Sequence, residues 1–526
     1  MSTIQSIVQD LLDPSSYPEK TSSVELIETH ISYIFLTGRF VYKIKKPVDF
    51  GFLDFTTPEK RRHFCQQEVF LNSRLSPDVY LGVVEIRKNR GRFSIGDSGE
   101  TVEYAVKMRQ LPRERMMGAL LAKGAVTPTM IQRVADKIAS FHARAEHSPE
   151  IARLGGLEAV KVNVSENFQQ TERYIGKTVT REIYNCLRAY SQAFIQVNEA
   201  LFKQRESQGK VRDCHGDLHT AQICLENGIA ILDCIEFNER FRYSDVASDI
   251  AFLAMDLDYH GRPDLSRLLM ESYVQQLDDP GLWPFLDFYK VYRAYVRGKV
   301  ASFSLDSPTL TGEQSRAFSE TARRYFDLAY SYVPLLEGAA LFLFTGLMGT
   351  GKSSVARELA QHTGALVISS DEVRKEMAGI PSTEHRYVPW GKDIYSLELS
   401  SKTYEELLTR ARAEIAQGRP VILDAAYGKR ELRRQAQQLA VEITMPFWVI
   451  ETRCPEETVR QRLDIRLELG NAASDGRWEL FARQKEQFEE VTEVPRAHHI
   501  ILDTSRPMEE IAATLLKELY VRKLAA

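Results

Sequence analysis

Residues 340–360 read ALFLFTGLMGTGKSSVARELA, and this stretch decides the fold of the second part of the chain. A short apolar run leads directly into Gly346-Leu-Met-Gly-Thr-Gly351-Lys352-Ser353, which matches the pattern GxxxxGK[ST] in full, and helical sequence follows. Glycines at these positions let backbone N–H groups turn inward around phosphate oxygens, and the N-terminus of the next helix favours negative charge. We therefore predict a phosphate-binding loop between a buried strand and a helix.

The loop predicts a site for ATP and Mg²⁺. We expect Lys352 to neutralise phosphate charge and the Ser353 hydroxyl to ligate Mg²⁺. Asp424, at the end of the apolar run VILD, is a second candidate ligand of Mg²⁺, unless it merely starts the following loop. The complete set of residues that we expect to bind the nucleotide here is Gly346, Gly349, Thr350, Gly351, Lys352, Ser353 and Ser354.

The sequence around the loop predicts an α/β domain with a parallel sheet. The apolar runs ALVIS, VILDA and FWVIET resemble the strand before the loop, and helical sequence separates each from the next. Buried strands that alternate with helices indicate a parallel sheet covered on both faces. Pro334 and Gly338 precede the first strand, so we place a domain boundary near residue 335. The predicted domains are 1–335 and 336–526.

A carboxylate and a guanidinium follow the second of these strands in SSDEVRKEM. If a helix begins at Ser370, Asp371 and Arg374 share one face near its positive end. Asp371 is then a candidate base for an attacking hydroxyl, and Arg374 a candidate ligand of the acceptor or of the transferring phosphoryl group. The alternative is that Ser370 and Asp371 are simply helix caps.

These residues resemble the kinase branch of P-loop proteins, such as polynucleotide 5′-kinases and gluconate-kinase-like small-molecule kinases, over about residues 339–505. In that branch a DxxR pair follows the second strand. The resemblance implies an arginine-bearing lid over ATP, for which Arg462 and Arg466, four residues apart on a predicted helix, are candidates near the segment NAASDGRWEL. A solvated charged helix is the alternative.

The first part of the chain predicts a different, bilobal α+β architecture. Strand-like runs with one helix occupy roughly residues 24–111, and mostly helical sequence follows to about Tyr332. Residues 214–238, CHGDLHTAQICLENGIAILDCIEFN, resemble the catalytic loop and metal-binding aspartate of aminoglycoside phosphotransferases and related protein-kinase-like enzymes. The resemblance implies a base at Asp217 and metal ligands at Asp233 and Gln222. Gln222 stands where the family has Asn and carries the same amide oxygen on a side chain one methylene longer.

The resemblance also implies a lysine and glutamate pair in the first domain. Lys43 lies on a predicted strand and Glu68 in a helical stretch, so they match the phosphate-binding lysine and its helix partner. Lys45 shares the strand face with Lys43 and is the competing assignment. No GxGxxG lies between the first strands, where Thr29 and Ser32 are candidate phosphate donors instead.

Composition excludes several classes of protein. The chain has 526 residues, and 68 Lys and Arg against 72 Asp and Glu give a formal charge of −4, so a surface that grips nucleic acid throughout is excluded. The six cysteines form no CxxC pair, which argues against a disulfide framework or a zinc site. With no signal peptide and no long apolar segment, we expect a cytoplasmic protein without a membrane partner.

We therefore expect a bifunctional, ATP- and Mg²⁺-dependent kinase that phosphorylates a hydroxyl of a small molecule. In one alternative only the P-loop domain transfers phosphate, and the first domain binds or regulates. In another the P-loop domain acts on nucleic-acid 5′-hydroxyls; it rests on Lys429, Arg430, Arg433 and Arg434 and ranks lower because surface helices are often this charged. A third is a non-enzymatic nucleotide sensor. The sequence names neither the acceptor nor the oligomeric state.

Overall fold

The computed structural model describes residues 3–51, 53–96, 98–226, 228–308, 310–333, 340–381, 393–469 and 476–525. The chain forms two compact units: unit 1 is Met1–Tyr174 with Asn198–Tyr332, and unit 2 is Ile175–Val197 with Val333–Ala526. The predicted boundary near residue 335 falls among residues 334–339, outside the described ranges. Among the described residues, no helix has the length and apolar character needed to cross a membrane.

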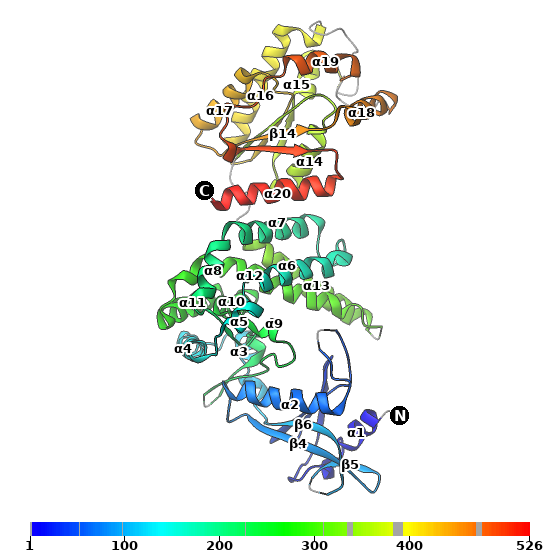
Figure 1. The fold of residues 1–526 in the computed structure, drawn as a ribbon, viewed down its shortest axis with the longest axis vertical. Helices are drawn as coiled ribbons and strands as arrows, with labels where there is room; N and C mark the ends of the chain where they lie inside the picture. The colour runs from blue at the N-terminus through cyan, green and yellow to red at the C-terminus, as the bar shows by residue number, and fades with distance from the viewer. Residues whose placement is uncertain are drawn as a thin grey trace. The chain divides into compact units, whose positions relative to one another are not determined.

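Unit 1 begins with a six-stranded antiparallel sheet in the order β1-β2-β3-β6-β4-β5. Helix α2 (Pro58–Ser73) follows β3 in the chain and packs against β4 and β6 (Figure 1). Thr57 caps this helix through its side chain, and Pro58 stands in the first turn, where a missing N–H costs nothing. The strands are β1 (Glu25–Glu28), β2 (Ser32–Leu36), β3 (Phe40–Lys45), β4 (Tyr80–Asn89), β5 (Arg92–Ile95) and β6 (Glu100–Arg109).

The rest of unit 1 is mainly helical, so the predicted bilobal, kinase-like α+β architecture is confirmed. Helix α10 (Val246–Tyr259) lies at its centre, with every residue from Val246 to Leu257 buried. Two small antiparallel sheets, β7 with β10 and β8 with β9, carry the loops of interest. The other elements are α1 (Thr3–Asp10), α3 (Met117–Ala122), α4 (Pro128–Arg144), α5 (Pro149–Gly155), α6 (Leu157–Thr171), α8 (Glu199–Ser207), β7 (Val211–Asp213), β8 (Ile223–Leu225), β9 (Ile229–Ile231), α9 (Glu239–Arg242), β10 (Tyr243–Asp245), α11 (Pro263–Leu277), α12 (Leu286–Ser304) and α13 (Gly312–Ser331).

Unit 2 contains a five-stranded parallel sheet in the order β12-β13-β11-β14-β15, which confirms the predicted α/β P-loop architecture. The four predicted apolar runs are β11 to β14, and β15 is an edge strand with alternating burial. The strands are β11 (Leu341–Thr345), β12 (Leu366–Ser369), β13 (Val421–Asp424), β14 (Phe447–Arg453) and β15 (His499–Asp503). The helices are α14 (Lys352–Thr363), α15 (Ser370–Met377), α16 (Leu397–Ile415), α17 (Arg430–Glu442), α18 (Glu456–Leu469), α19 (Trp478–Gln487) and α20 (Met508–Ala525).

The strand register brings the chemistry of unit 2 to one edge of this sheet. Asp424, the last residue of β13, pairs with Phe344 of β11 on one side and with Ser369 of β12 on the other. The phosphate loop follows β11, and α15 follows β12. Since the strands are parallel, both segments start from the carboxyl edge where Asp424 ends, which is where open α/β sheets bind ligands. In Figure 1, α16 and α17 lie on the opposite side of the sheet from α14 and α20.

Helix α7 (Arg181–Val197) belongs to unit 2 although its sequence lies within the first part of the chain. It packs along α20, where the Cys186 Sγ and the Tyr520 hydroxyl are 3.0 Å apart and the rings of Tyr190 and Tyr520 are 5.8 Å apart. The local sequence pattern did not predict this pairing, because it joins segments more than 300 residues apart.

Candidate functional site

The loop after β11 is held in a conformation that only glycine allows. Gly346 and Gly349 have φ of +140° and +75°, in the region that L-residues rarely adopt. A Cβ on Gly346 would lie 2.6 Å from the Thr452 carbonyl oxygen, and one on Gly349 would lie 2.8 Å from Cγ1 of Val459. The glycines are therefore needed for their conformation and for the close approach of the neighbouring backbone and α18.

Lys352 opens α14 and turns its side chain back over the loop. Its Nζ donates a hydrogen bond of 2.8 Å to the carbonyl of Leu347. Burial lowers the pKa of Lys352 to about 8, although the carboxylates of Asp424 and Asp371 oppose the shift. The site thus holds a desolvated cation that a phosphate group would stabilise.

Asp424 and Ser353 supply oxygen donors beside Lys352. Asp424 is only 5% exposed, and burial raises the pKa of its carboxyl, an effect that a hydrogen bond with Ser353 and the charge of Lys352 reduce. A hydroxyl and a carboxylate are the ligands that a hard cation such as Mg²⁺ prefers, so this pair fits the predicted metal site. Thr350 is buried, and its hydroxyl contacts the Leu347 carbonyl and the Thr452 hydroxyl, each at 2.7 Å.

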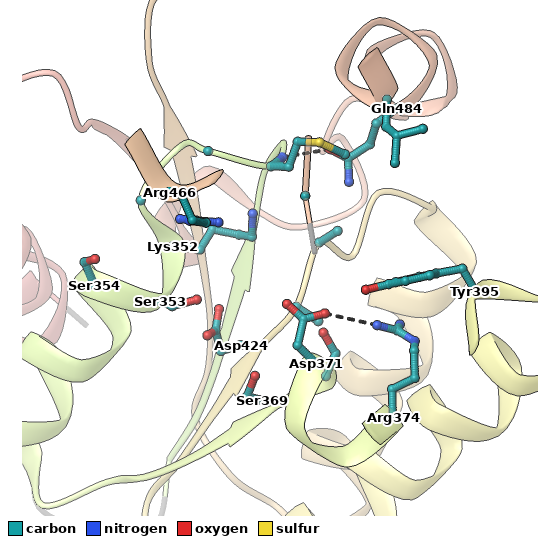
Figure 2. A pocket seen from close by; sticks show the side chains of 18 of the residues that line it. Lys352, Ser353, Ser354, Ser369, Asp371, Arg374, Tyr395, Asp424, Arg466 and Gln484 are labelled. Carbon is teal, nitrogen blue, oxygen red and sulfur yellow. Dashed lines mark hydrogen bonds and ion pairs between the residues drawn. The ribbon is translucent and has the colours of Figure 1, made fainter. Parts of the chain in front are cut away.

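Asp371 and Arg374 lie across the same pocket on α15. The Arg374 NH1 group donates to the Asp371 carboxylate at 3.0 Å, and the guanidinium lies 4.8 Å from the centre of the Tyr395 ring. Figure 2 shows Arg374 and Tyr395 on the opposite side of the pocket from Lys352 and Ser353, with Asp371 between Arg374 and Asp424. The predicted start of the helix at Ser370 is confirmed, and the Asp371 carboxylate binds Arg374. Among the residues that the structure describes, the buried Nε of Arg374 has no hydrogen-bond partner.

One cavity of about 290 Å³ joins these groups. Ser354 and Arg466 also line it, whereas Arg462 donates to the Thr504 carbonyl at 2.6 Å and is absent from the lining. Residues 471–475 of the segment NAASDGRWEL lie outside the described residues, whereas Gly476 and Leu480 of the same segment line the cavity. Lining residues that the sequence did not predict are Met348, Arg357, Ser369, Tyr395, Ser400, Tyr404, Ala425, Ala426 and Gln484.

Long-range packing positions the cavity-lining residues that the sequence did not predict. Gln484 on α19 accepts a hydrogen bond of 2.7 Å from the N–H of Met348, which ties this helix to the phosphate loop. The rings of Trp478 and Phe481 stack, and Phe481 packs with Val459 and Leu463 of α18 against the loop. No motif signals such contacts, because they depend on where helices far along the chain return to the sheet.

In unit 1 both candidate lysines reach Glu68. Lys43 Nζ lies 2.8 Å from one carboxylate oxygen of Glu68, and Lys45 Nζ lies 2.7 Å from the other. Lys43 also contacts Asp233 at 2.6 Å, whereas Lys45 is almost fully buried and pairs with Glu236. The two lysines therefore differ in their second partner, which is the partly exposed Asp233 for Lys43 and the buried Glu236 for Lys45.

Asp233 occupies a strained position on the predicted metal loop. Its φ is +63°, which is rare for a residue other than glycine, and its N–H donates to the Tyr80 hydroxyl at 3.0 Å. Its carboxyl group is 44% exposed, so oxygen ligands remain available for a metal ion. Gln222 ends the short 3₁₀ helix Thr220–Gln222, and its carbonyl accepts from the N–H of Leu232.

The buried carboxylate of Asp249 holds the loop that carries Asp217. Asp249 accepts hydrogen bonds of 2.9 Å from the N–H groups of His215 and Gly216, and it contacts His142. Asp217 itself is one-third exposed and lies 3.4 Å from Nε2 of His219. Burial opposes its ionisation, but His219, Arg297 and His215 outweigh burial and lower the pKa of Asp217. Asp217 is therefore an ionised, accessible carboxylate on a loop that Asp249 holds in place.

Basic residues on and before α17 are paired with acids. Arg433 is fully buried and pairs with Glu493, and Lys429 lies 3.3 Å from Glu489. The Arg430 N–H donates to Glu489 at 2.7 Å. This cluster is therefore neutralised in large part.

Comparison with known proteins gives one family model and several relatives. Residues 341–491 match the model described as an AAA domain. Uncharacterized proteins Rv2004c of Mycobacterium tuberculosis and Mb2027c of Mycobacterium bovis are each 32% identical to this chain over 436 residues, covering 82% of the chain and 83% of the relative. The chain belongs to the family of these mycobacterial proteins. The match to the AAA domain model contains the P-loop of unit 2, which implies ATP binding.

Solved structures with partial likeness cover each unit separately. A gluconokinase from Sinorhizobium meliloti 1021 is 18% identical, covering 36% of this chain and 95% of its own, with a TM-score of 0.26. A GDP complex of aminoglycoside 2′-phosphotransferase-IIIa is 14% identical, covering 59% of this chain and 94% of its own, with a TM-score of 0.37. At these values the likenesses identify neither a reaction nor a substrate.

Proposed function

We propose that this protein is an ATP- and Mg²⁺-dependent phosphotransferase that transfers the γ-phosphate of ATP to a hydroxyl group of a small molecule. The observation that carries the proposal is the pocket of unit 2, in which Lys352 and the Asp371–Arg374 pair face one cavity from opposite sides. A phosphate-binding group and a base with a substrate-binding cation are the parts that phosphoryl transfer requires.

The residues of this pocket divide the reaction between them. Lys352 and the loop N–H groups bind the phosphates, and Arg374 orients the acceptor. Asp371 takes the proton of the acceptor hydroxyl as its oxygen bonds to the γ-phosphorus and the bond to the leaving oxygen of ADP breaks. Ser353 and Asp424 would hold Mg²⁺, which supplies charge neutralisation for the phosphates when bound.

Unit 1 offers a second set of groups for the same reaction. Lys43, fixed by Glu68, is placed to bind phosphate, and the exposed carboxyl of Asp233 is placed to hold a metal ion together with Gln222. Asp217 is the candidate base at a second acceptor hydroxyl. We therefore propose two transfer sites in one chain.

A small-molecule acceptor is favoured over a nucleic-acid end. The cavity of unit 2, at about 290 Å³, has the size of a small-ligand site, and three of the four basic residues at α17, Lys429, Arg430 and Arg433, already have acidic partners. A duplex or single strand gripped by phosphate contacts would instead need exposed cations without such partners.

The test is transfer of label from γ-labelled ATP by the full chain with Mg²⁺, using a pooled metabolite extract and, separately, 5′-hydroxyl oligonucleotides. We expect labelled small molecules whose yield falls with Lys352→Ala and with Asp217→Asn, each abolishing a different product. Lys402→Ala, which removes an exposed lysine of α16, should leave every product unchanged. Labelled oligonucleotides alone would overturn the small-molecule acceptor, and the absence of any labelled product would overturn the reaction.

A further inference from the structure

One face of α12 is hydrogen-bonded to the loop that carries Asp217. Arg293 on this face donates from NH1 to the carbonyl of Gly216 at 2.9 Å and from Nε to the carbonyl of Ser248 at 3.1 Å. Because residues four apart lie on the same face of a helix, Arg297 follows Arg293 one turn further along. This register places the Arg297 guanidinium in the neighbourhood of Asp217, whose ionised form it stabilises.

Arg297 stands on an aromatic platform and forms no ion pair with a carboxylate within the described ranges. Its guanidinium lies 5.5 Å from the centre of the Tyr325 ring, and that ring stacks on Tyr259 at 3.9 Å. Tyr325 also donates to Asp256 at 3.4 Å, so the platform under the arginine is itself fixed. Arg297 is only half-buried, so part of the residue remains accessible to a ligand.

We propose that the acceptor of the unit 1 site carries an anionic group, a carboxylate or a phosphate, and that Arg297 binds this group beside the hydroxyl that Asp217 faces. The proposal rests on the proposed function, since it concerns the acceptor of that site. A guanidinium presents a planar set of donors that matches both anions. A polycationic acceptor would instead meet Arg297 as a like charge in a partly buried setting, which disfavours it.

The experiment uses the full chain with Lys352→Ala, so that transfer reports on unit 1. Glycerate and glycerol 3-phosphate are the anionic probes, glycerol is the neutral one and kanamycin the cationic one. We expect higher kcat/KM for at least one anionic probe than for glycerol or kanamycin. Arg297→Ala should raise KM for that probe by about tenfold to a hundredfold with little change in kcat, and Arg297→Lys should restore part of the loss.

A control arginine separates this effect from a general loss of charge or stability. Arg324 is exposed and lies over the ring of Tyr259, the ring that stacks on Tyr325. Arg324→Ala should leave KM and kcat unchanged. If Arg297→Ala lowers kcat equally for anionic and neutral probes, Arg297 acts on Asp217 or on the nucleotide, and the proposal is overturned. A preference for kanamycin would overturn it as well.

A binding measurement keeps the inference testable if no probe is phosphorylated. Hydrogen exchange of the α12 peptide is then compared with and without glycerate or glycerol 3-phosphate, in the presence of a non-hydrolysable ATP analogue. Protection by an anion that Arg297→Ala removes and Arg324→Ala preserves would support the anion site while the transfer reaction fails. No protection of the unsubstituted protein by either anion would overturn the proposal.

Discussion

At the scale of single residues, the charge of Lys352 controls how the P-loop pocket responds to pH. Burial lowers the pKa of this lysine to about 8, so it is mostly charged at pH 7 and mostly neutral at pH 9. Only the charged form attracts phosphate. ATP should therefore bind more weakly as the pH rises through 8, with Kd increasing up to about tenfold per pH unit above that value.

Calorimetric titration of ATP between pH 7 and 9 measures this dependence, in a chain whose unit 1 site is removed by Lys43→Ala. The matched variant Lys352→Arg keeps its charge throughout this range, so its Kd should not follow the same curve. An equal rise in Kd for both proteins would show that another group titrates.

Asp217 and Asp249 are both acids of the same loop region, but their substitution should have opposite consequences. Asp217→Asn should abolish transfer at unit 1 and cost less stability than Asp249→Ala, because the Asp217 side chain is partly exposed and solvent screens its interactions with His219 and Arg297. Asp249→Ala leaves two buried N–H groups without partners, which should cost about 3 kcal/mol. Hydrogen exchange of residues 211–222 should speed up only in Asp249→Ala; unchanged protection there would refute the anchoring role.

At the scale of elements, the contact between the phosphate loop and α18 depends on the absence of a side chain. Gly349→Ala would drive a Cβ to within 2.8 Å of Val459, so we expect the loop to shift and ATP affinity to fall at least about tenfold. Gly364→Ala is the matched control, since Gly364 also has positive φ, +64°, but its Cβ would meet open space. That control should lose about 1 kcal/mol of stability and keep its affinity for ATP. Equal affinities in the two variants would contradict the packing argument.

The same elements show how far sequence reasoning reaches. The strand, loop and helix at residues 341–363 are local in sequence, so the pattern predicted their structure and the loop residues that line the pocket. The pair Asp371 and Arg374 could be predicted from the sequence for the same reason, because one turn of helix sets their geometry. Tyr395 and Gln484 could not be predicted, because the 3₁₀ helix Asp393–Tyr395 and α19 reach the pocket by long-range packing that no spacing encodes.

Unit 1 shows the same limit. The sequence found Lys43, Glu68 and Asp217, but it could not tell that Lys45 also reaches Glu68. Both lysines stand on one face of β3, two residues apart, and alternation along a strand cannot choose between them. The choice depends on Asp233 and Glu236, which lie almost 200 residues later.

At the scale of the whole molecule, α7 links the sequence of the first part of the chain to the packing of unit 2. Tyr190→Ala would remove the ring that contacts Tyr520, and we expect it to destabilise unit 2 by about 3 kcal/mol. Arg188→Ala, at an exposed position of the same helix, should change stability by less than about 0.5 kcal/mol. Hydrogen exchange of residues 508–525 provides the readout, and unchanged protection of α20 in Tyr190→Ala would refute the assignment of α7 to unit 2.

The stoichiometry of Mg²⁺–ATP binding to the full chain shows whether one chain has two ATP sites. Calorimetry should find two ATP molecules per chain, with one lost in Lys352→Ala and the other in Lys43→Ala. Two ATP molecules still bound to Lys352→Ala, or none bound to the unsubstituted protein, would contradict the assignment of one ATP site to each unit.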